Sequence, residues 1–299
     1  MTDQFLNLPD GRRLCYRDTG KGTPLILVIG LSLQLTAWPE EMLDGLERRG
    51  FRLITLDNRD VGRSSRIAVP PPSQLRLLMR WGRPEDYVLS DMAGDVLALM
   101  DHLSLGSAHL AGMSMGGMIA QTLAATHPAR VRSLVSIFSN TGARRHGQPS
   151  MQAMLFLMKR PARTRDEAIA RHLGMMRLVG GTTHRFDEDR GRAYAAAAWE
   201  RGGPDPHHGV ARQMMAILKS GDRTASLGRI TAPTLVLHGD RDLLVHPSGG
   251  VATAAAIPGA RLVQIGGMGH DLAPSVAPEL ARMIADHAEA SGAVEAEAI

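Results

Sequence analysis

The sequence predicts an α/β protein in which a mostly parallel, doubly wound sheet is interrupted by one helical insertion. Short apolar runs rich in branched residues alternate with longer amphipathic segments in the first half of the chain, and again near its end. Between about residues 140 and 226, helix-forming runs follow one another without a strand pattern between them. Because strand and helix alternate on both sides of that stretch, we expect it to be inserted between two strands of one sheet.

The N-terminal elements begin with a predicted hairpin at the sheet edge. The turn sequence LPDG at 8–11 precedes RRLCYRD at 12–18, whose alternation of apolar and polar residues is typical of a strand with one solvated face. The continuous apolar runs at 24–30 and 51–57 predict strands that are buried on both faces, as in a parallel sheet. The segment 38–50 between them has helical spacing, acidic residues near its start and a glycine at its end.

The later elements repeat this rhythm on either side of the insertion. We expect strands and helices at the following ranges: helix 87–106, strand 108–114, helix 115–128, strand 131–139, strand 233–239, helix 247–256, strand 260–267 and a last helix to about residue 290. The chain is therefore divided into a core domain (1–139 and 227–290), a helical cap (140–226) and a flexible tail (291–299).

Composition and charge narrow the classes of function. The 299 residues carry a formal net charge of +4, but acidic residues are interleaved with the basic ones even in the densest basic run, at 160–171, so nucleic-acid binding is not expected. Cys15 is the only cysteine, which excludes an intrachain disulfide and makes a cysteine-based metal site improbable. No signal-peptide pattern and no apolar run of about eighteen residues is present, so we expect a cytoplasmic protein without a membrane span.

Ser114 is the candidate nucleophile. It stands in the stretch LAGMSMGG at 110–117, where Gly112 and Gly116 flank it in a G-x-S-x-G pattern between a predicted strand and a predicted helix. In that context a sharp turn holds the serine in a strained backbone conformation above the sheet, at the positive end of a helix. The alternative is a structural or phosphate-binding turn that contains a serine by chance.

A nucleophilic serine needs a base and an orienting acid. His270 follows the strand at 260–267 and precedes the last helix, so it is placed at a strand end like Ser114, and imidazole can exchange a proton near neutral pH. His238 also ends a strand and is the competing candidate; its alternative role is a packed histidine that anchors the next loop. Asp240 and Asp242 follow that same strand and are the candidate acids.

The oxyanion formed during acyl transfer would be bound by backbone amides. We expect these to be the amide of Met115, directly after the nucleophile, and that of Leu31, in the loop after the strand at 24–30. Backbone donors have no side-chain signature, so this prediction rests on position alone.

These motifs resemble those of the α/β-hydrolase superfamily over nearly the whole chain. The elbow at Ser114, DNRDVGRSS at 57–65, HGDRD at 238–242 and GMGHD at 267–271 carry the resemblance. It implies an α/β-hydrolase fold and the order Ser114, Asp242, His270 for the triad, which selects Asp242 over Asp240. The loop at 57–65 is similar to the family's D-x-R-G-x-G-x-S loop, with Asp60 where glycine is usual. Asp57, Arg59 and Asp60 are expected to be structural.

The resemblance is strongest to serine esterases of the aclacinomycin methylesterase-like branch, which hydrolyse a methyl ester on a polyketide. It implies a carboxylesterase that uses an acyl-enzyme on Ser114, acts on a small-molecule ester and needs no cofactor or metal. A lactonase, a carbon–carbon bond hydrolase and a cofactor-free perhydrolase share the same triad and stay open, as does a non-catalytic ligand-binding protein of this fold. Four methionines are the candidate substrate-binding residues, because their side chains would give a site an adaptable apolar lining: Met113, Met151, Met154 and Met175. The alternative is that the methionines of the insertion pack the core of the cap itself.

Overall fold

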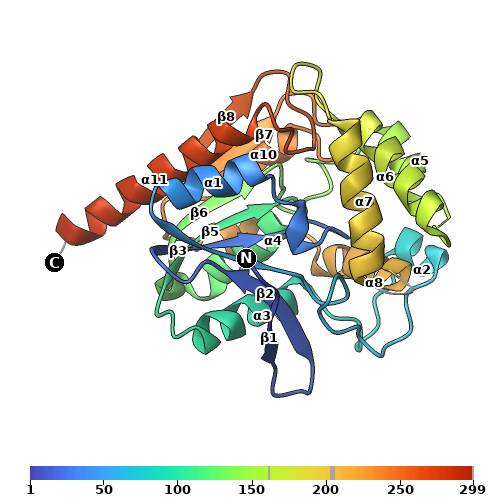
Figure 1. Ribbon diagram of the computed structural model, residues 1–299, viewed down its shortest axis with the longest axis horizontal. Helices are drawn as coiled ribbons and strands as arrows, with labels where there is room; N and C mark the ends of the chain where they lie inside the picture. Colours follow the sequence, from blue (N-terminus) through green and yellow to red (C-terminus); the bar gives the residue numbers. More distant parts are fainter. Residues whose placement is uncertain (161, 203–205, 298–299) are drawn as a thin grey trace.

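The computed structural model describes residues 1–160, 162–202 and 206–297, and these contain an eight-stranded sheet (Figure 1). Its strands are β1 (Gln4–Asn7), β2 (Arg13–Asp18), β3 (Thr23–Val28), β4 (Phe51–Leu56), β5 (Ala108–Met113), β6 (Val131–Ile137), β7 (Thr234–Gly239) and β8 (Arg261–Ile265). They are arranged in the order β1-β2-β4-β3-β5-β6-β7-β8. Strands β3 to β8 run parallel, and β1 and β2 form an antiparallel hairpin at one edge. The predicted mostly parallel sheet and edge hairpin are confirmed.

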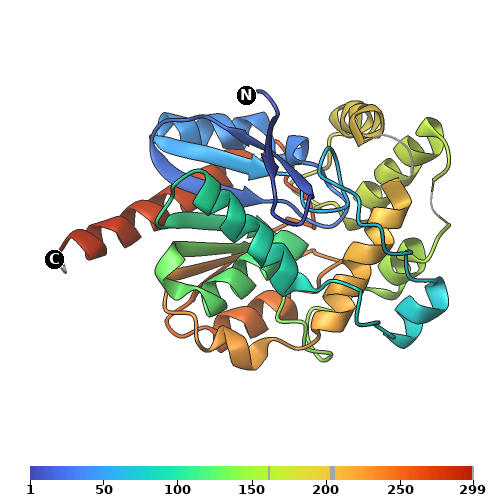
Figure 2. The ribbon, with the colours of Figure 1, turned by 90° about the horizontal axis from the view of Figure 1, so that it is seen from below.

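Helices cover both faces of the sheet, as Figures 1 and 2 show. Helix α1 (Glu40–Arg48) packs against α11 (Ala277–Glu297) on one face. Helices α3 (Leu89–His102) and α4 (Met115–Thr126) pack together on the other face, and α10 (Ser248–Ala256) adds to it. The sheet is therefore buried on both sides, which explains why its central strands are continuous apolar runs.

Alternate residues of β3 show how one strand serves two cores. Leu25 and Leu27 belong to the cluster under α1 and α11, whereas Ile26 and Val28 belong to the cluster under α3 and α4. This follows from the two-residue period of a strand, which turns successive side chains to opposite faces. The rigid sheet that results fixes the loops at its carboxyl edge.

Between β6 and β7 the described residues contain helices and no strand. These helices are α5 (Met151–Leu157), α6 (Arg165–Val179), α7 (Glu188–Gly202), α8 (Pro206–Ser220) and α9 (Thr224–Leu227). Figures 1 and 2 show α5 to α8 grouped at one end of the sheet, where the loops after β3, β4 and β8 lie. The helical character predicted for this stretch is thus observed, while its treatment as a separate cap domain stays a prediction.

Two segments differ from the sequence-based expectation. Residues 291–297, predicted to belong to a flexible tail, continue α11, and residues 298–299 of that tail lie outside the described residues. Alanine and glutamate dominate the segment, and both favour helix. Short helical turns were also not predicted: α2 (Gln74–Met79), η1 (Leu35–Ala37) and η2 (Pro128–Arg130). In the described part of the chain, every helix is too short or too polar to cross a bilayer.

Candidate active site

Ser114 lies at a tight turn between β5 and α4. Its φ of 55° and ψ of −120° fall in a region that residues other than glycine rarely adopt. A Cβ on Gly112 would lie 2.3 Å from the carbonyl oxygen of Gly116, and one on Gly116 would lie 2.0 Å from that of Val28. The turn therefore requires glycine on both sides of the serine. It leaves Ser114 partly exposed at the N-terminus of α4.

Ser114, His270 and Asp242 form a continuous hydrogen-bonded chain. The Nε2 atom of His270 lies 3.0 Å from Ser114 Oγ, and its Nδ1 atom lies 2.7 Å from Asp242 Oδ2. With the ring proton on Nδ1, His270 donates to Asp242 and accepts the Ser114 hydroxyl. Ser114 follows β5, Asp242 follows β7 and His270 follows β8. Loops that are distant in sequence therefore meet at the carboxyl edge of the sheet. The structure thus brings together the three residues that the sequence selected.

Asp242 is a buried carboxylate with a full set of partners. Its side chain is completely covered, and its Oδ1 atom accepts the amides of Leu244 and Val245, each at 2.8 Å. Burial disfavours the ionised form, but the interactions with His270 and His238 outweigh it and lower the pKa of Asp242 to about 2. Asp240 instead accepts the amide of Gly267 at the partly exposed rim. Asp242, and not Asp240, therefore faces His270.

The competing histidine, His238, is a packed core residue. Its ring is fully buried, and its Nε2 atom lies 2.8 Å from the carbonyl oxygen of Val245 and 3.3 Å from Asp242 Oδ2. It therefore anchors the loop that carries Asp242, which is the alternative role that the sequence left open for it. The ring of His270 packs against Phe138, with 4.5 Å between ring centroids. Sequence reasoning did not identify this contact, because Phe138 is one apolar residue among many at the end of β6.

The loop after β3 lies directly against the serine. A Cβ on Gly30 would be 3.3 Å from Ser114 Cβ, so only the backbone of Gly30 separates the two segments. Leu31 follows at once, and Met115 is the first residue of α4. Within the residues described, neither the Leu31 nor the Met115 amide donates to another protein group. Both candidate oxyanion donors are thus next to Ser114 and free to bind an oxygen.

Asp57, at the end of β4, is a hydrogen-bond hub and does not contact Ser114 or His270. Its carboxylate accepts the amide of Leu35 at 2.8 Å, the amide of Arg63 at 2.9 Å and the guanidinium of Arg201 at 2.6 Å. Arg59, two residues later, forms a buried ion pair with Asp95 of α3. These contacts agree with the structural role expected for the segment 57–65.

Asp60 explains the departure from the family pattern at that position. Its φ is 71°, in the left-handed region where glycine carries no steric cost. The buried carboxylate of Asp60 forms a two-point ion pair with Arg212 of α8, at 2.7 and 2.9 Å. An aspartate thus takes the usual place of a glycine and connects the loop 57–65 to the helical insertion.

The candidate substrate-binding methionines do not share one environment. Met113 is 4% exposed and belongs to the core cluster under α1 and α11, so it presents almost no surface to a ligand. On α5, Met151 is 74% and Met154 41% exposed, and Met175 is partly buried on α6. A role for the three insertion methionines in binding substrate stays a prediction, whereas Met113 is accounted for by core packing.

Asp271, the residue after His270, is a buried carboxyl that sequence reasoning did not single out. Neither of its oxygens has a hydrogen-bond partner among the described residues. Burial raises the pKa of Asp271 to about 6, although the nearby backbone amide of Gly181 and the position near His270 work in the opposite direction. Two adjacent residues of one motif thus have opposite environments, since His270 is fully partnered and Asp271 is not.

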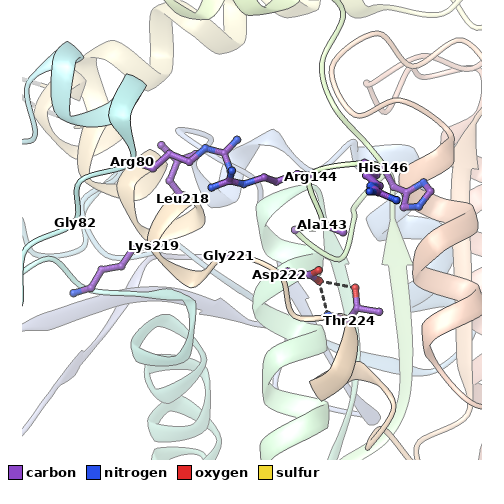
Figure 3. Close-up of a pocket in the computed structure, with 12 residues that line it drawn as sticks. Arg80, Gly82, Ala143, Arg144, His146, Leu218, Lys219, Gly221, Asp222 and Thr224 are labelled. Carbon is purple, nitrogen blue, oxygen red and sulfur yellow. Dashed lines mark hydrogen bonds between the residues drawn. The ribbon is translucent and has the colours of Figure 1, made fainter.

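A separate cavity of about 860 Å³ has a basic lining (Figure 3). Arg80, Arg144 and Lys219 contribute to its wall, and the first two extend toward each other in Figure 3. Asp222 also lines it, but its carboxylate accepts the hydroxyl and amide of Thr224. The residues of the Ser114 chain are not part of this lining, so the cavity is distinct from the candidate active site.

Comparison with known proteins agrees with this architecture. Residues 23–274 match the family model described as alpha/beta hydrolase fold. The chain is 31% identical over 293 residues to the rhodomycin D methylesterases DauP of Streptomyces sp. (strain C5) and DnrP of Streptomyces peucetius, covering 90% of this chain and 91% of each relative. Among solved structures, a hydrolase from Pseudomonas aeruginosa PA01 is similar, with a TM-score of 0.69, 27% identity and coverage of 97% and 98%. The chain therefore belongs to the alpha/beta hydrolase fold family.

Proposed function

We propose that this protein is a serine esterase that hydrolyses a carboxylic ester on a hydrophobic small molecule. The observation that carries the proposal is the hydrogen-bonded chain from Ser114 Oγ through His270 to the buried carboxylate of Asp242. A serine hydroxyl is a weak nucleophile by itself, and an adjacent imidazole held by an acid activates it. The similarity to two esterases over nine-tenths of the chain supports the same conclusion.

In the proposed mechanism His270 acts first as a base and then as an acid. It takes the Ser114 proton while the oxygen attacks the ester carbonyl, and Asp242 stabilises the imidazolium that forms. The amides of Leu31 and Met115 bind the negative oxygen of the tetrahedral intermediate. His270 then gives the proton to the departing alcohol, which leaves the acyl group on Ser114. Water, deprotonated by His270, hydrolyses that acyl-enzyme and regenerates the hydroxyl.

The substrate class comes from the relatives. Both are named for removing a methyl ester from rhodomycin D, so we propose a methyl ester on a bulky polycyclic or polyketide-like scaffold as the substrate form to test first. The leaving methanol is small, and the scaffold would then lie on the acyl side of the scissile bond. The exposed apolar residues of α5, Met151 and Leu155, would be available to such a scaffold.

The proposal is tested by labelling and turnover together. A fluorophosphonate probe should modify Ser114 and no other residue, as mapped by mass spectrometry. Hydrolysis of p-nitrophenyl butyrate should fall by about 10⁴-fold or more in Ser114→Ala, because the serine and histidine act as one unit. Ser226→Ala, which removes a hydroxyl from α9, is the matched control and should keep wild-type turnover. Equal rates for wild type and Ser114→Ala would leave only a ligand-binding role.

A panel of substrates then separates the reactions that the triad allows. Aromatic methyl esters should be better substrates than short acetate esters of small alcohols, and a strict preference for the latter would contradict the bulky-substrate proposal. Turnover of lactones, or product formation that requires hydrogen peroxide, would instead assign the lactonase or the perhydrolase reaction to the same Ser114.

A further inference from the structure

The loop 31–35 after β3 is held mainly by helices of the insertion. The amide of Ser32 donates to Gln213 Oε1 on α8 at 3.0 Å, and the amide of Gln34 donates to Tyr194 Oη on α7 at 3.0 Å. The side chain of Gln34 adds a 2.6 Å bond to the carbonyl oxygen of Ala198 on α7. Only the amide of Leu35, bound by Asp57, is held from the core side among these contacts.

Gln213 is placed as a bridge between two loops of the core. Its side chain is fully buried, and its Nε2 atom donates to the carbonyl oxygen of Arg59 at 2.8 Å while its Oε1 atom accepts Ser32. A buried amide with both ends satisfied has one stable orientation, since reversing it would leave a donor facing a donor. The preceding residue, Arg212, forms a separate ion pair with Asp60 of the loop 57–65.

The backbone of Ser32 has a strained conformation. Its φ is 63°, a left-handed conformation that persists in a non-glycine residue only where the surroundings hold it. The residue before it is Leu31, whose amide is a candidate oxyanion donor. Gly30, one residue earlier, lies against Ser114. Because Leu31 is joined directly to Ser32, a change in the backbone of Ser32 would shift Leu31 and displace its amide relative to Ser114.

We propose that Gln213 is a positioning residue for ester hydrolysis: from α8 it holds Ser32 and thereby aims the Leu31 amide at the oxyanion. The inference rests on the proposed function, because it concerns the efficiency of that same reaction. It makes the insertion part of the oxyanion-binding machinery, in addition to any role in covering the substrate. A donor nitrogen stabilises an oxyanion effectively only at about 2.7–3.1 Å from its oxygen. A small shift of the loop is therefore sufficient to reduce turnover.

The test compares Gln213→Met with a variant that loosens α8 elsewhere. Gln213→Met keeps the length of the side chain and removes both hydrogen bonds. We expect kcat on p-nitrophenyl butyrate to fall about 10- to 100-fold, with KM within about threefold of wild type, because the lost interaction is made in the transition state. The rate at which a fluorophosphonate labels Ser114 should fall in parallel, since phosphonylation uses the same oxyanion site.

The matched control is the double variant Asp60→Gly with Arg212→Met. It removes both charges of the ion pair between α8 and the loop 57–65, together with the bond from the Ile67 amide to Asp60, and it restores the glycine usual at that left-handed position. Its kcat should stay within about threefold of wild type. An equal fall in kcat for the control and for Gln213→Met would overturn the inference, because the loss would then come from loosening the helix.

A third variant, Gln213→Glu, distinguishes the loss of the Ser32 contact from a general folding defect. One carboxyl oxygen can accept the Ser32 amide, and the other, in the protonated form that burial favours, can donate to the Arg59 carbonyl oxygen. We therefore expect kcat to recover most of the loss seen in Gln213→Met, with melting temperatures recorded for all variants. Equal kcat for Gln213→Met and Gln213→Glu would contradict the inference. Failure of the proposed function has a different signature, namely a wild-type protein that neither hydrolyses esters nor reacts with the fluorophosphonate at Ser114.

Discussion

Ser114 lies between two segments that are held in opposite ways. The elbow at 112–117 is fixed by its own glycines and by the strands beside it, through contacts such as the 2.9 Å bond from the Ser114 amide to the carbonyl oxygen of Ile137. The loop 31–35 takes its hydrogen bonds from Gln213 and Tyr194, more than 150 residues later in the chain. The nucleophile is thus positioned by the glycines of its turn and by the neighbouring strands of the sheet, and the proposed oxyanion loop by the helices of the insertion.

This difference indicates which parts of the site can vary independently. The insertion contacts the loop 31–35 through α7 and α8, whereas the amide of Ser114 in the elbow is bound by the carbonyl oxygen of Ile137 in β6. If the insertion also binds the substrate, substrate preference and oxyanion geometry would be coupled, because α7 and α8 belong to the insertion and hold the loop 31–35.

The largest effect should come from Asp242→Asn, which leaves both loops in place but disrupts the triad. An amide at this position cannot fix the proton on Nδ1 of His270 and cannot stabilise an imidazolium, so kcat should fall about 10⁴-fold. Asp240→Asn is the matched control, since Asp240 lies at the rim, where it accepts the amide of Gly267 and lies 3.7 Å from the Arg241 guanidinium. Steady-state kinetics on one ester substrate checks both variants, and comparable activity of the two would contradict the assignment of the acid.

The next effect should come from Gly116→Ala, which breaks the elbow itself. The new Cβ would lie 2.0 Å from the carbonyl oxygen of Val28, and neither backbone can yield, so we expect a loss of stability of about 4 kcal/mol or more. Chemical denaturation measures it. Gly94→Ala in α3 is the control, because nothing lies within 4 Å of the new Cβ. The free energy of unfolding of this variant should rise by about 0.5–1 kcal/mol. A fully stable Gly116→Ala would mean that the elbow is more adaptable than its geometry indicates.

Asp271→Asn should alter the pH dependence of stability more than the reaction. Burial raises the pKa of Asp271 in the folded protein to about 6, above that of an unfolded aspartate, so folding favours its protonated form. The Asp271 carboxyl should therefore cost nothing in stability below pH 4, and its contribution should become unfavourable by up to about 3 kcal/mol as the pH rises from about 4 to 6. Asp271→Asn should lack this unfavourable contribution.

Denaturation midpoints measured between pH 4 and 7 for wild type and Asp271→Asn test that expectation. As the pH rises over this interval, the denaturation midpoint of Asp271→Asn should increase relative to that of wild type. Esterase activity at pH 7 should be retained. Parallel pH curves would show that Asp271 does not carry an unfavourable buried charge.

The smallest effect should come from Tyr194→Phe, on the loop side of the comparison. It removes the oxygen that accepts the Gln34 amide but leaves the Gln213 contact in place, so we expect about a fivefold fall in kcat, equivalent to about 1 kcal/mol. Tyr16→Phe is the control, because that hydroxyl meets His102 away from the loop. If Tyr194→Phe matches Tyr16→Phe in kcat, α7 does not contribute to the geometry of the loop.

How far the sequence predicts the site depends on whether a residue has a local signature. The elbow has one, because G-x-S-x-G between a strand and a helix predicts a sharp turn and supplies the two glycines that the turn requires. His270 and Asp242 follow strand ends and could be chosen by position and family pattern. Phe138 and Asp271 have none: their significance arises from what they contact, or fail to contact, in the folded protein. The methionines show the converse, since Met113 is apolar and next to Ser114 but packs in the core.

By itself the sequence determined the sheet, the helical insertion and the candidacy of Ser114 and His270, and the family pattern added Asp242. Apolar periodicity and glycine placement are properties of short segments, and they carry over directly into strands, helices and turns. Only the tertiary structure decided that Gln213 and Tyr194 hold the loop 31–35, and that Asp60 pairs with Arg212. Such contacts join segments that are far apart in the chain, and hydrogen bonding of a buried polar group leaves no periodic pattern from which they could be predicted.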